Sequence, residues 1–236
     1  SVHHNYFAHN YARNPRIALD VNAEVVNNLI YNYGSSATKL APGAEVNAIG
    51  NIYQPGSDTE IQLGDSKRDK VRGILIDSIN GSDFLLYVKE NIGPGRLSNN
   101  GNEWSVVFGD AAEQFRSMDP VPGFEPTGIQ EYSVDGLAEI ILAEAGAIIP
   151  NRDAIDIRVV EDYRNQTGRV IDSQNEVGGW LVMADAEGPL DSDNDGMPDT
   201  WEEDNGLNPN DAADSKLDRN NDGYTNVEEY INSFFD

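Results

Sequence analysis

Short apolar runs recur with a fixed period in the N-terminal part of the chain. Asn5, Asn28 and Asn51 lie 23 residues apart, and two apolar residues follow each asparagine. A period in the low twenties with β-like runs favours a parallel β-solenoid, in which each repeat forms one coil. Asparagines stacked at equivalent turns can hydrogen bond along the axis and satisfy buried polar groups. The alternative is an antiparallel set of strands with chance spacing, which the in-phase β-branched and aromatic residues disfavour.

The chain between about residues 60 and 125 is mixed, with Gly- and Asn-rich turns between short apolar runs. Three of these runs predict strands, at 73–77, 84–88 and 104–108. Together with the repeats they predict that residues 1–125 are mainly β and built from solenoid coils. A coil needs a neighbour or a cap on each side, and no capping element precedes the first coil. We therefore expect further N-terminal coils, in the same chain or in a cleaved one.

The pattern changes to a helical one from Ser133 onward. Ser133 is expected to cap a helix that ends near Gly146, and a second helix is expected from about Asp153 to Asn165. Their apolar faces comprise Leu137, Ile140 and Ile141 in the first helix and Ile155, Val159 and Tyr163 in the second. Helices that follow a solenoid can cover its open end or lie along its side. Residues 126–188 are therefore predicted to form a helical extension that packs on the coils.

The charge of the chain argues against several classes of partner. Lys and Arg total 16 against 41 Asp and Glu, which gives a formal charge of −25. This balance argues against nucleic acid, whose phosphates need clustered cations, and against anionic membrane surfaces, and it suits cation binding. From Asp191 to Asp236 there are 14 acids against Lys216 and Arg219, a balance of −12. A solvated acidic tail would have the same count, so the spacing of the acids has to decide.

Cysteine usage and hydropathy exclude further kinds of site. There is no cysteine, which rules out disulfides, zinc–thiolate sites and a cysteine nucleophile. No apolar run approaches the roughly 20 residues of a membrane-spanning helix, so no membrane span is expected.

The acidic segment that follows the Gly188-Pro189 break contains two twelve-residue loops of the kind that binds calcium. Such a loop offers oxygens from positions 1, 3, 5, 7, 9 and 12, with glycine at position 6 for the sharp turn. The predicted calcium ligands are Asp191, Asp193, Asp195, Met197 through its carbonyl, Asp199 and Glu202 in the first loop, and Asp218, Asn220, Asp222, Tyr224 through its carbonyl, Asn226 and Glu229 in the second.

Two such loops in tandem are a strong signal for Ca²⁺. Their first residues, Asp191 and Asp218, are too close in the chain for two full helix–loop–helix units. The arrangement resembles the compact EF-hand-like pairs of dockerins and thrombospondin-type repeats. Without metal the aspartates would repel one another, so we expect calcium binding to be coupled to folding of residues 189–236. Weak sites of this kind stay filled outside cells, which points to a secreted or cell-surface protein.

Three closely spaced histidines, His3, His4 and His9, suggest a metal site or acid–base chemistry. Neighbouring residues of a strand point to opposite faces, so His3 and His4 are not expected to face one ion. The interpretation we favour is structural, with one histidine in a polar stack and the others at the surface.

Arg13 and Arg16 flank a proline that stiffens the turn between them. In so acidic a chain, a fixed pair of arginines suggests recognition of carboxylates, because guanidinium is always charged and binds them in a bidentate way. A structural ion pair with nearby acids such as Asp20 or Glu24 explains the pair equally well. Residue types alone leave these two interpretations open.

The run HHNYFAHNYARNPR, followed by VVNNLIYNYG, resembles the late coils of polysaccharide lyase family 1, the pectate lyases. An Arg-x-Pro run after an HHN-containing strand is part of that family's signature, and Arg13-Asn14-Pro15 matches it. The segments from Arg152 to Trp180 and the first calcium loop resemble the C-terminal extension of bacterial members. The resemblance is weak between about residues 60 and 125.

The resemblance implies a right-handed parallel β-helix and β-elimination on a polyuronate such as polygalacturonate. In the family, calcium bridges the substrate carboxylate and the protein, and an arginine removes the proton from the adjacent ring carbon. Arg13 matches the catalytic arginine, and Arg16 is a candidate substrate contact. The family pattern often has a further arginine where this chain has Ala18, which weakens the substrate contact there. The family's catalytic calcium ligands precede the HHN strand and are not in this chain.

Two functions are therefore carried forward. The first is the C-terminal part of a secreted, calcium-dependent polysaccharide lyase that acts on an acidic polysaccharide. The second is a non-catalytic, calcium-stabilised solenoid, such as an adhesin, a carbohydrate-binding protein or a filament subunit. The Arg13-x-Pro15 match favours the first, and the absence of the acidic coils keeps the second open.

Overall fold

The computed structural model describes residues 1–59, 73–76, 83–109, 112–123, 128–149, 151–182 and 187–234. The chain divides into two compact units, Ser1–Leu181 and Val182–Asp236, which are described separately. Within the described residues, no helix has both the length and the apolar character needed to cross a bilayer.

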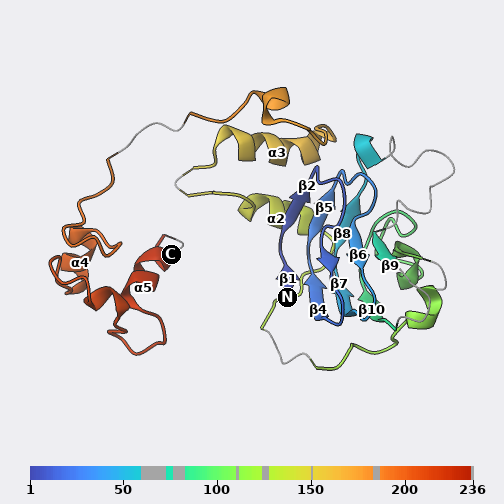
Figure 1. Ribbon diagram of the computed structural model, residues 1–236, viewed down its shortest axis with the longest axis horizontal. Helices are drawn as coiled ribbons and strands as arrows, with labels where there is room; N and C mark the ends of the chain where they lie inside the picture. Colours follow the sequence, from blue (N-terminus) through green and yellow to red (C-terminus); the bar gives the residue numbers. More distant parts are fainter. Residues whose placement is uncertain are drawn as a thin grey trace. The chain divides into compact units, whose positions relative to one another are not determined.

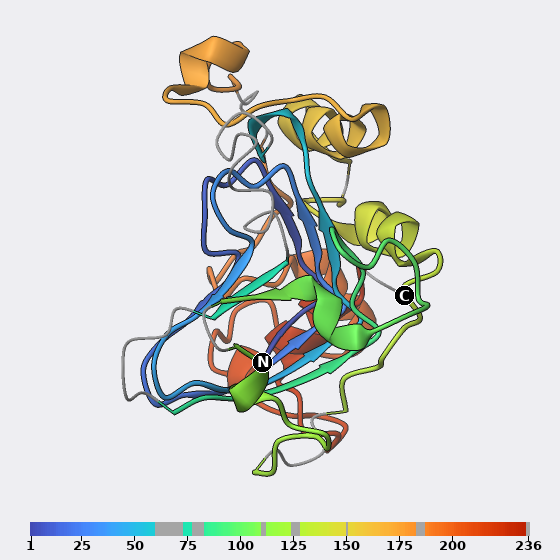
Figure 2. The ribbon, with the colours of Figure 1, turned by 90° about the vertical axis from the view of Figure 1, so that its right-hand side faces the viewer.

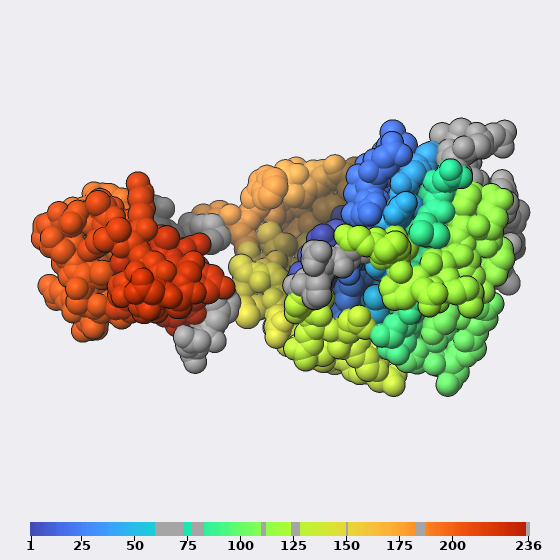
Figure 3. All heavy atoms as spheres, turned by 90° about the horizontal axis from the view of Figure 1, so that it is seen from below, coloured from blue at the N-terminus to red at the C-terminus, as the bar shows by residue number. Residues whose placement is uncertain are grey.

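Unit 1 is mainly β and contains three parallel sheets (Figures 1 and 2). The first sheet contains β1 (Val2–His3), β4 (Asn22–Val26), β7 (Glu45–Ile49) and β10 (Leu85–Lys89). The second contains β2 (Tyr6–Ala8), β5 (Leu29–Tyr31) and β8 (Ile52–Gln54). The third has the order β11 (Val107–Phe108), β9 (Ile74–Ile76), β6 (Thr38–Leu40) and β3 (Arg16–Ile17). Figure 3 shows successive coils side by side, from blue through cyan to green.

The register of the sheets confirms the period seen in the sequence. Val2 pairs with Val25, Tyr6 with Leu29 and Arg16 with Lys39, so each pair is offset by one period. Each of these coils thus contributes one strand to each sheet, an arrangement consistent with a β-helix. Apolar side chains fill the interior between the sheets, and the residues fully buried there include Val25, Ile30, Leu40, Val46 and Leu86.

The predicted asparagine ladder is present at the turn between the first and second sheets. The side-chain amide of Asn5 donates to Asn28 Oδ1 at 2.9 Å, and that of Asn28 donates to Asn51 Oδ1 at 2.9 Å. Asn51 in turn donates to Asn91 at 2.8 Å, which adds a rung that the sequence period did not predict. The last interval is longer, because the offset from Asn51 to Asn91 is 40 instead of 23.

A residue with positive φ precedes every rung of the ladder. His4, Asn27, Gly50 and Glu90 have φ values of 54°, 49°, 61° and 57°. This left-handed corner turns the chain from the first sheet into the second. The alternation of side chains between the two faces of a strand therefore stops at this residue. Glycine and asparagine adopt this conformation most readily, which accounts for two of the four corner residues.

Two predicted elements differ from the structure. The run 104–108 is a 3₁₀ helix, η2 (Glu103–Val106), followed by only the two residues of β11, because the side chain of Asn102 accepts from Trp104 N and caps that turn. The first helix, α2 (Leu137–Glu144), begins after Gly136 in a left-handed conformation, so Ser133 is not its N-cap. Asp77 of the predicted strand 73–77 lies outside the described residues.

The second predicted helix is confirmed as α3 (Ala154–Asn165), which Asp153 caps by accepting from Ile155 N and Asp156 N. Helices α2 and α3 lie along the β2-β5-β8 sheet rather than over the end of the coils (Figure 1). Leu137, Ile141 and Leu142 of α2 and Val160 of α3 bury the outer side chains of Leu29 and Ile52. Shorter 3₁₀ turns are η3 (Ala112–Phe115) and η4 (Gln174–Val177).

The described residues of unit 2 contain two short helices, each at the end of a predicted calcium loop. They are α4 (Asp199–Asn205) and α5 (Asn226–Asn232), with the 3₁₀ turn η5 (Asp214–Lys216) between them. The two loops are closed alike, since Asp199 N donates to Leu190 O at 2.9 Å and Asn226 N donates to Leu217 O at 2.7 Å. The tandem pattern in the sequence therefore corresponds to two equivalent turns of backbone.

Candidate functional site

The backbone around Arg13 is held by the next coil. Arg13 has a φ of 69°, and its N–H donates to Ser36 O at 3.1 Å. The N–H of Asn14 donates to Ala37 O at 2.8 Å, and the Asn14-Pro15 peptide is cis. These hydrogen bonds join two adjacent coils, so coil stacking rather than a free loop sets the position of the Arg13 backbone.

Arg13 lines an open groove of about 840 Å³ on unit 1. Lys39 lines the same groove and pairs in register with Arg16 across β3 and β6. Tyr11, half exposed, adds an aromatic surface, and Gly34 allows its ring to lie close because an added Cβ would be 2.6 Å from Tyr11 Cδ2. The groove therefore combines cationic and aromatic side chains, which suits an anionic ligand with apolar faces.

Neither arginine takes part in the structural ion pair that the sequence left open. Both Arg13 and Arg16 are exposed, and within the described ranges neither guanidinium has an ion-pair or hydrogen-bond partner. Glu24, one of the proposed partners, instead accepts a hydrogen bond from Ser1 Oγ at 3.2 Å. The structure thus gives no support for the structural ion pair within these ranges, and carboxylate binding by the two arginines stays a prediction.

The prediction that His3 and His4 face away from each other is wrong. Their Nδ1 atoms lie 2.8 Å apart, because β1 ends at His3 and His4 already occupies the left-handed corner. The prediction of one histidine in a polar stack is confirmed by His9. Its Nδ1 accepts from Asn32 Nδ2 at 2.9 Å, so the proton is on Nε2, which donates to Asp162 Oδ2 at 3.2 Å. His9 thus anchors α3 to the coils.

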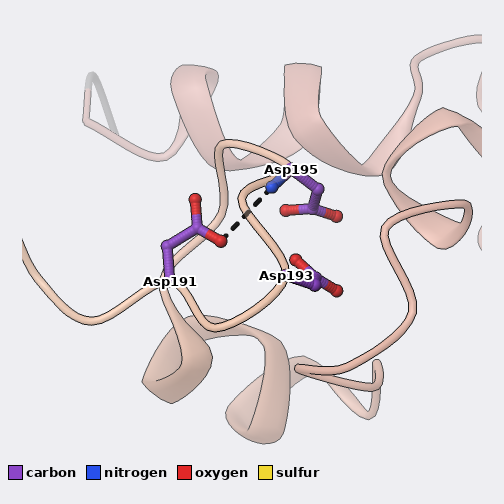
Figure 4. A group of neighbouring side chains, drawn as sticks. All are labelled: Asp191, Asp193 and Asp195. Carbon is purple, nitrogen blue, oxygen red and sulfur yellow. Dashed lines mark hydrogen bonds between the residues drawn. The ribbon is translucent and has the colours of Figure 1, made fainter.

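In unit 2 the first loop brings three predicted ligands together. Carboxylate oxygens of Asp191, Asp193 and Asp195 lie within 4.8 Å of one another (Figure 4). The carboxylate of Asp191 also accepts from Asp195 N at 3.2 Å and from Gly196 N at 3.0 Å, which closes the loop. Gly196 has a φ of 98°, a conformation that favours glycine at this turn.

A second group of oxygens shares Asp195. Asp195, Glu202 and Asp214 offer carboxylate oxygens within 4.8 Å of one another. Glu202 is 0% exposed, and burial followed by the charges of Asp195 and Asp193 raises its pKa to about 7. Since a carboxylate resists ionisation there without a compensating charge, this is an environment that a cation would stabilise.

The pattern of unpartnered atoms fits a cation. Among the described residues, six buried carboxylate oxygens around the first loop have no hydrogen-bond partner. They are both oxygens of Asp193, both of Glu202, Oδ2 of Asp195 and Oδ1 of Asp214. Buried polar atoms in proteins are nearly always paired, and calcium takes six to eight oxygens. The residues present therefore fit Ca²⁺.

The side chains at position 9 of the two loops are hydrogen bonded to residues near the start of their own loops. Both carboxylate oxygens of Asp199 accept from Ser192, at 2.7 Å from its N–H and 2.7 Å from its hydroxyl. In the second loop Asn226 Oδ1 likewise accepts from Arg219 N at 3.3 Å. In this structure Asp199 and Asn226 thus help to close their loops, and their predicted role as calcium ligands stays a prediction.

The second loop gathers fewer acids. Oxygens of Asp218, Asp222 and Glu229 lie within 4.8 Å of one another, and Asn220 donates to Asp222 at 3.0 Å. Glu229 is also paired with Arg219 at 2.9 Å, while its other oxygen has no partner among the described residues. The guanidinium of Arg219 thus already neutralises part of the negative charge of the second loop.

Arg219 also ties the second loop to α4. Its guanidinium donates to Asn205 O at 2.6 Å and stacks over the ring of Trp201. The two loops are therefore packed into one unit through this side chain.

Three residues of the ladder and of the candidate sites were missed in the sequence. Lys39 carries no motif, and only its register with Arg16, one period earlier, marks it. Asp214 lies outside both loop patterns, so only the folded structure reveals its position. Asn91 could have been recognised from the asparagine followed by an apolar residue, but its spacing breaks the period.

No established family model matches the chain. The chain is 30% identical to probable pectate lyase C of Aspergillus flavus over 245 residues, which is 99% of this chain and 53% of that protein. It is likewise 30% identical to probable pectate lyase C of Aspergillus oryzae and 26% identical to that of Emericella nidulans, over 99% of this chain and 53% and 52% of those proteins. The chain therefore spans about half the length of the curated relatives it matches. These similarities relate it, over nearly its whole length, to pectate lyase-like proteins.

Proposed function

We propose that this chain is the C-terminal part of a secreted polysaccharide lyase that cleaves an acidic polysaccharide by calcium-assisted β-elimination. The observation that carries the proposal is the exposed, coil-anchored Arg13 in a cationic groove, in a chain similar to probable pectate lyases. In this proposal the parallel sheets of unit 1 are the last coils of a right-handed β-helix. In the same proposal, the remaining coils belong to the part of the protein that this chain does not include.

Arg13 and Lys39 of the groove, and Arg16, which pairs in register with Lys39, have roles in the proposed reaction. Lys39 and Arg16 hold substrate carboxylates, because they form adjacent cationic positions on β6 and β3. Arg13 removes the proton from the ring carbon next to the carboxylate, the bond from the neighbouring carbon to the glycosidic oxygen breaks, and a carbon–carbon double bond forms. The departing sugar oxygen takes up a proton. Arginine is ordinarily protonated, so the proposed role requires Arg13 to lose a proton before or during the transfer.

The calcium of this reaction is assigned to residues outside the chain. When bound, it would neutralise the substrate carboxylate and make the adjacent proton more acidic. Within the described residues, the acidic clusters that could hold a metal all lie in unit 2. The loops of unit 2 are therefore proposed to have a separate, stabilising role.

The test is a cleavage assay on the full-length protein. With polygalacturonate and Ca²⁺, the unsaturated product is expected to absorb in the ultraviolet, and Arg13→Ala is expected to abolish the signal. Arg164→Ala is the control, since Arg164 is an exposed arginine on α3 that pairs with Glu139 and Glu161. The absence of product across a range of pH would overturn the proposal. Binding of polygalacturonate without cleavage would instead support a non-catalytic, carbohydrate-binding solenoid.

For unit 2 we propose an EF-hand-like module in which each loop holds one Ca²⁺. The carboxylates of Asp191, Asp193, Asp195 and Glu202 and the carbonyl of Met197 serve the first loop, and oxygens of Asp218, Asn220, Asp222, Tyr224 and Glu229 serve the second. Calorimetry is expected to show two sites, each weakened by the matching change, Glu202→Gln or Glu229→Gln. Unchanged binding in both variants would overturn the assignment of ligands.

A further inference from the structure

Asp214 lies in η5, between the two loops and outside the ligand pattern of either. It is 9% exposed. Its Oδ2 accepts from Asn208 N at 3.0 Å, which fixes the carboxylate. Its Oδ1 is buried and has no hydrogen-bond partner among the described residues. One carboxylate oxygen of Asp214 therefore has a structural role, and the other is available to a ligand.

The unused oxygen belongs to the same cluster as the first loop. Carboxylate oxygens of Asp214, Asp195 and Glu202 lie within 4.8 Å of one another. Calcium binds oxygens at about 2.3–2.6 Å, so two ligands on opposite sides of one ion are about 4.6–5.2 Å apart. The three carboxylates thus fit a single coordination sphere. Asp195 also belongs to the group with Asp191 and Asp193, so the two groups share one residue.

The first loop also has a position for an extra ligand. Asp199, which the loop pattern places at position 9, directs both of its oxygens to Ser192. Asp199 is also in neither of the two groups of clustered carboxylate oxygens, which is compatible with action through a water, as is common at position 9. Asp214 supplies a buried oxygen to the same cluster from a different part of the chain.

We propose that Asp214 is a direct ligand of the calcium ion in the first loop, contributed from outside the loop. This inference rests on the proposed calcium-binding function of unit 2. It makes the two sites unequal, because five carboxylates surround the first and three surround the second, where Arg219 already pairs with Glu229. More ligand charge gives tighter calcium binding, so the first site binds more tightly than the second.

Asp214 also connects the first site to the second loop. The buried Asn226 donates from its side-chain amide to the main-chain carbonyl of Asp214 at 2.7 Å. Calcium in the first loop would hold Asp214 in place, and with it the acceptor that positions Asn226. Filling of the first site therefore precedes filling of the second.

The test is a calcium titration of the full chain by calorimetry. Asp214→Asn keeps an oxygen for Asn208 N–H but removes the charge, and it is expected to weaken the tighter site by about tenfold or more. Asp204→Asn removes the same charge from an exposed position of α4 and is expected to leave both affinities unchanged. Equal affinity of the Asp214→Asn variant and the parent would overturn the inference. Absence of calcium binding by the parent would instead overturn the proposed module.

A second measurement separates direct ligation from a structural role. Terbium can replace calcium, and its luminescence lifetimes in H₂O and D₂O count the waters bound to it. In a Glu229→Gln background, which weakens the second loop, Asp214→Ala is expected to add one water to the ion of the first loop. An unchanged count in a variant that still binds terbium would show that Asp214 acts only through the fold.

Discussion

The two units bury polar side chains in opposite ways. In unit 1, Asn28, Asn51 and Asn91 are each 0% exposed, and each amide is hydrogen bonded to the next rung or to main-chain carbonyls. In unit 2, Glu202 is also 0% exposed, yet neither of its oxygens has a partner among the described residues. The first network is satisfied by the chain itself. The second has no such partners among the described residues, and in the proposed function a bound cation would supply the missing charge, which makes unit 2 the dependent unit.

Removal of calcium is expected to have the largest effect and tests the difference between the two units directly. Chelation is expected to unfold unit 2, because six buried, unpartnered oxygens and their charges are then uncompensated, and to leave unit 1 folded. Unfolding of unit 2 can be followed by trypsin cleavage after Arg219, because Asn205 and Glu229 hold this side chain in the folded loop. Cleavage after Arg219 is expected to accelerate by more than about tenfold on chelation, measured by mass spectrometry.

The control for this experiment is in the same digest. Arg96 is buried in unit 1 and paired with Glu103, so cleavage after it is expected to be independent of calcium. If both arginines became accessible together, the stability of unit 1 would also depend on calcium, and the contrast between the units would be wrong. If neither did, unit 2 would be stable without metal.

The second prediction breaks the ladder instead. Asn51 Oδ1 accepts from both the N–H and the side-chain amide of Asn28, at 3.0 and 2.9 Å. Asn51→Ala removes the acceptor of the Asn28 N–H and one of the acceptors of its side-chain amide, which otherwise donates to Val2 O and Val26 O, and is expected to destabilise unit 1 by about 2 kcal/mol. Hydrogen exchange read out by mass spectrometry is expected to show faster exchange in β5 and β8, with or without calcium.

Asn100→Ala is the matched control, since Asn100 is exposed and outside the ladder. It is expected to leave exchange unchanged. An Asn51→Ala variant as stable as the parent would mean that the ladder follows from coil stacking and contributes little to it.

The smallest expected effect concerns pH. Burial lowers the pKa of His9, although Asp162 acts in the opposite direction, so the folded state binds a proton less readily than the unfolded chain. The stability of unit 1 is therefore complete above pH 6.5, the ordinary value for histidine, and falls as the pH drops below it. Burial and the neighbouring His3 also lower the pKa of His4, which adds to the same trend.

The measurement is the urea midpoint of unit 1 at several pH values in saturating calcium. His9→Gln is expected to reduce the pH dependence without abolishing it, because His4 remains. A midpoint that rises as the pH falls from neutral into the acidic range would contradict the assigned direction. Asp58 and Arg158 also face His9, so their variants would test the opposing charges.

The parts of the fold that repeat were predictable from the sequence. A constant period requires the same contact at each step, and Asn5, Asn28 and Asn51 therefore identified the ladder and the parallel register before the structure. Asn91 was missed because its offset from Asn51 is 40, whereas the earlier rungs are offset by 23. A fixed period predicts only the contacts that recur at that spacing. It does not predict a rung that follows after a different spacing.

Local conformation and tertiary contacts were the parts that could not be predicted. His4 was placed on a regular strand, whereas its positive φ turns it toward His3. The loop pattern identified the carboxylates close in sequence, but Asp214 joins them only through the fold of η5. The roles of Arg13 and Arg16 and the boundaries at residues 125 and 188 remain predictions from sequence.

The irregular third interval of the ladder has a consequence for how this chain can change its length. The additional chain between Asn51 and Asn91 is accommodated without disturbing the ladder, because these two rungs still meet at 2.8 Å. Insertions are therefore tolerated when they begin and end between rungs, whereas a single residue added within a corner would shift every later strand to the wrong face. Two changes of length are therefore compatible with the ladder: one of a full period, which adds or removes a rung, and one between two rungs that still meet, as Asn51 and Asn91 do.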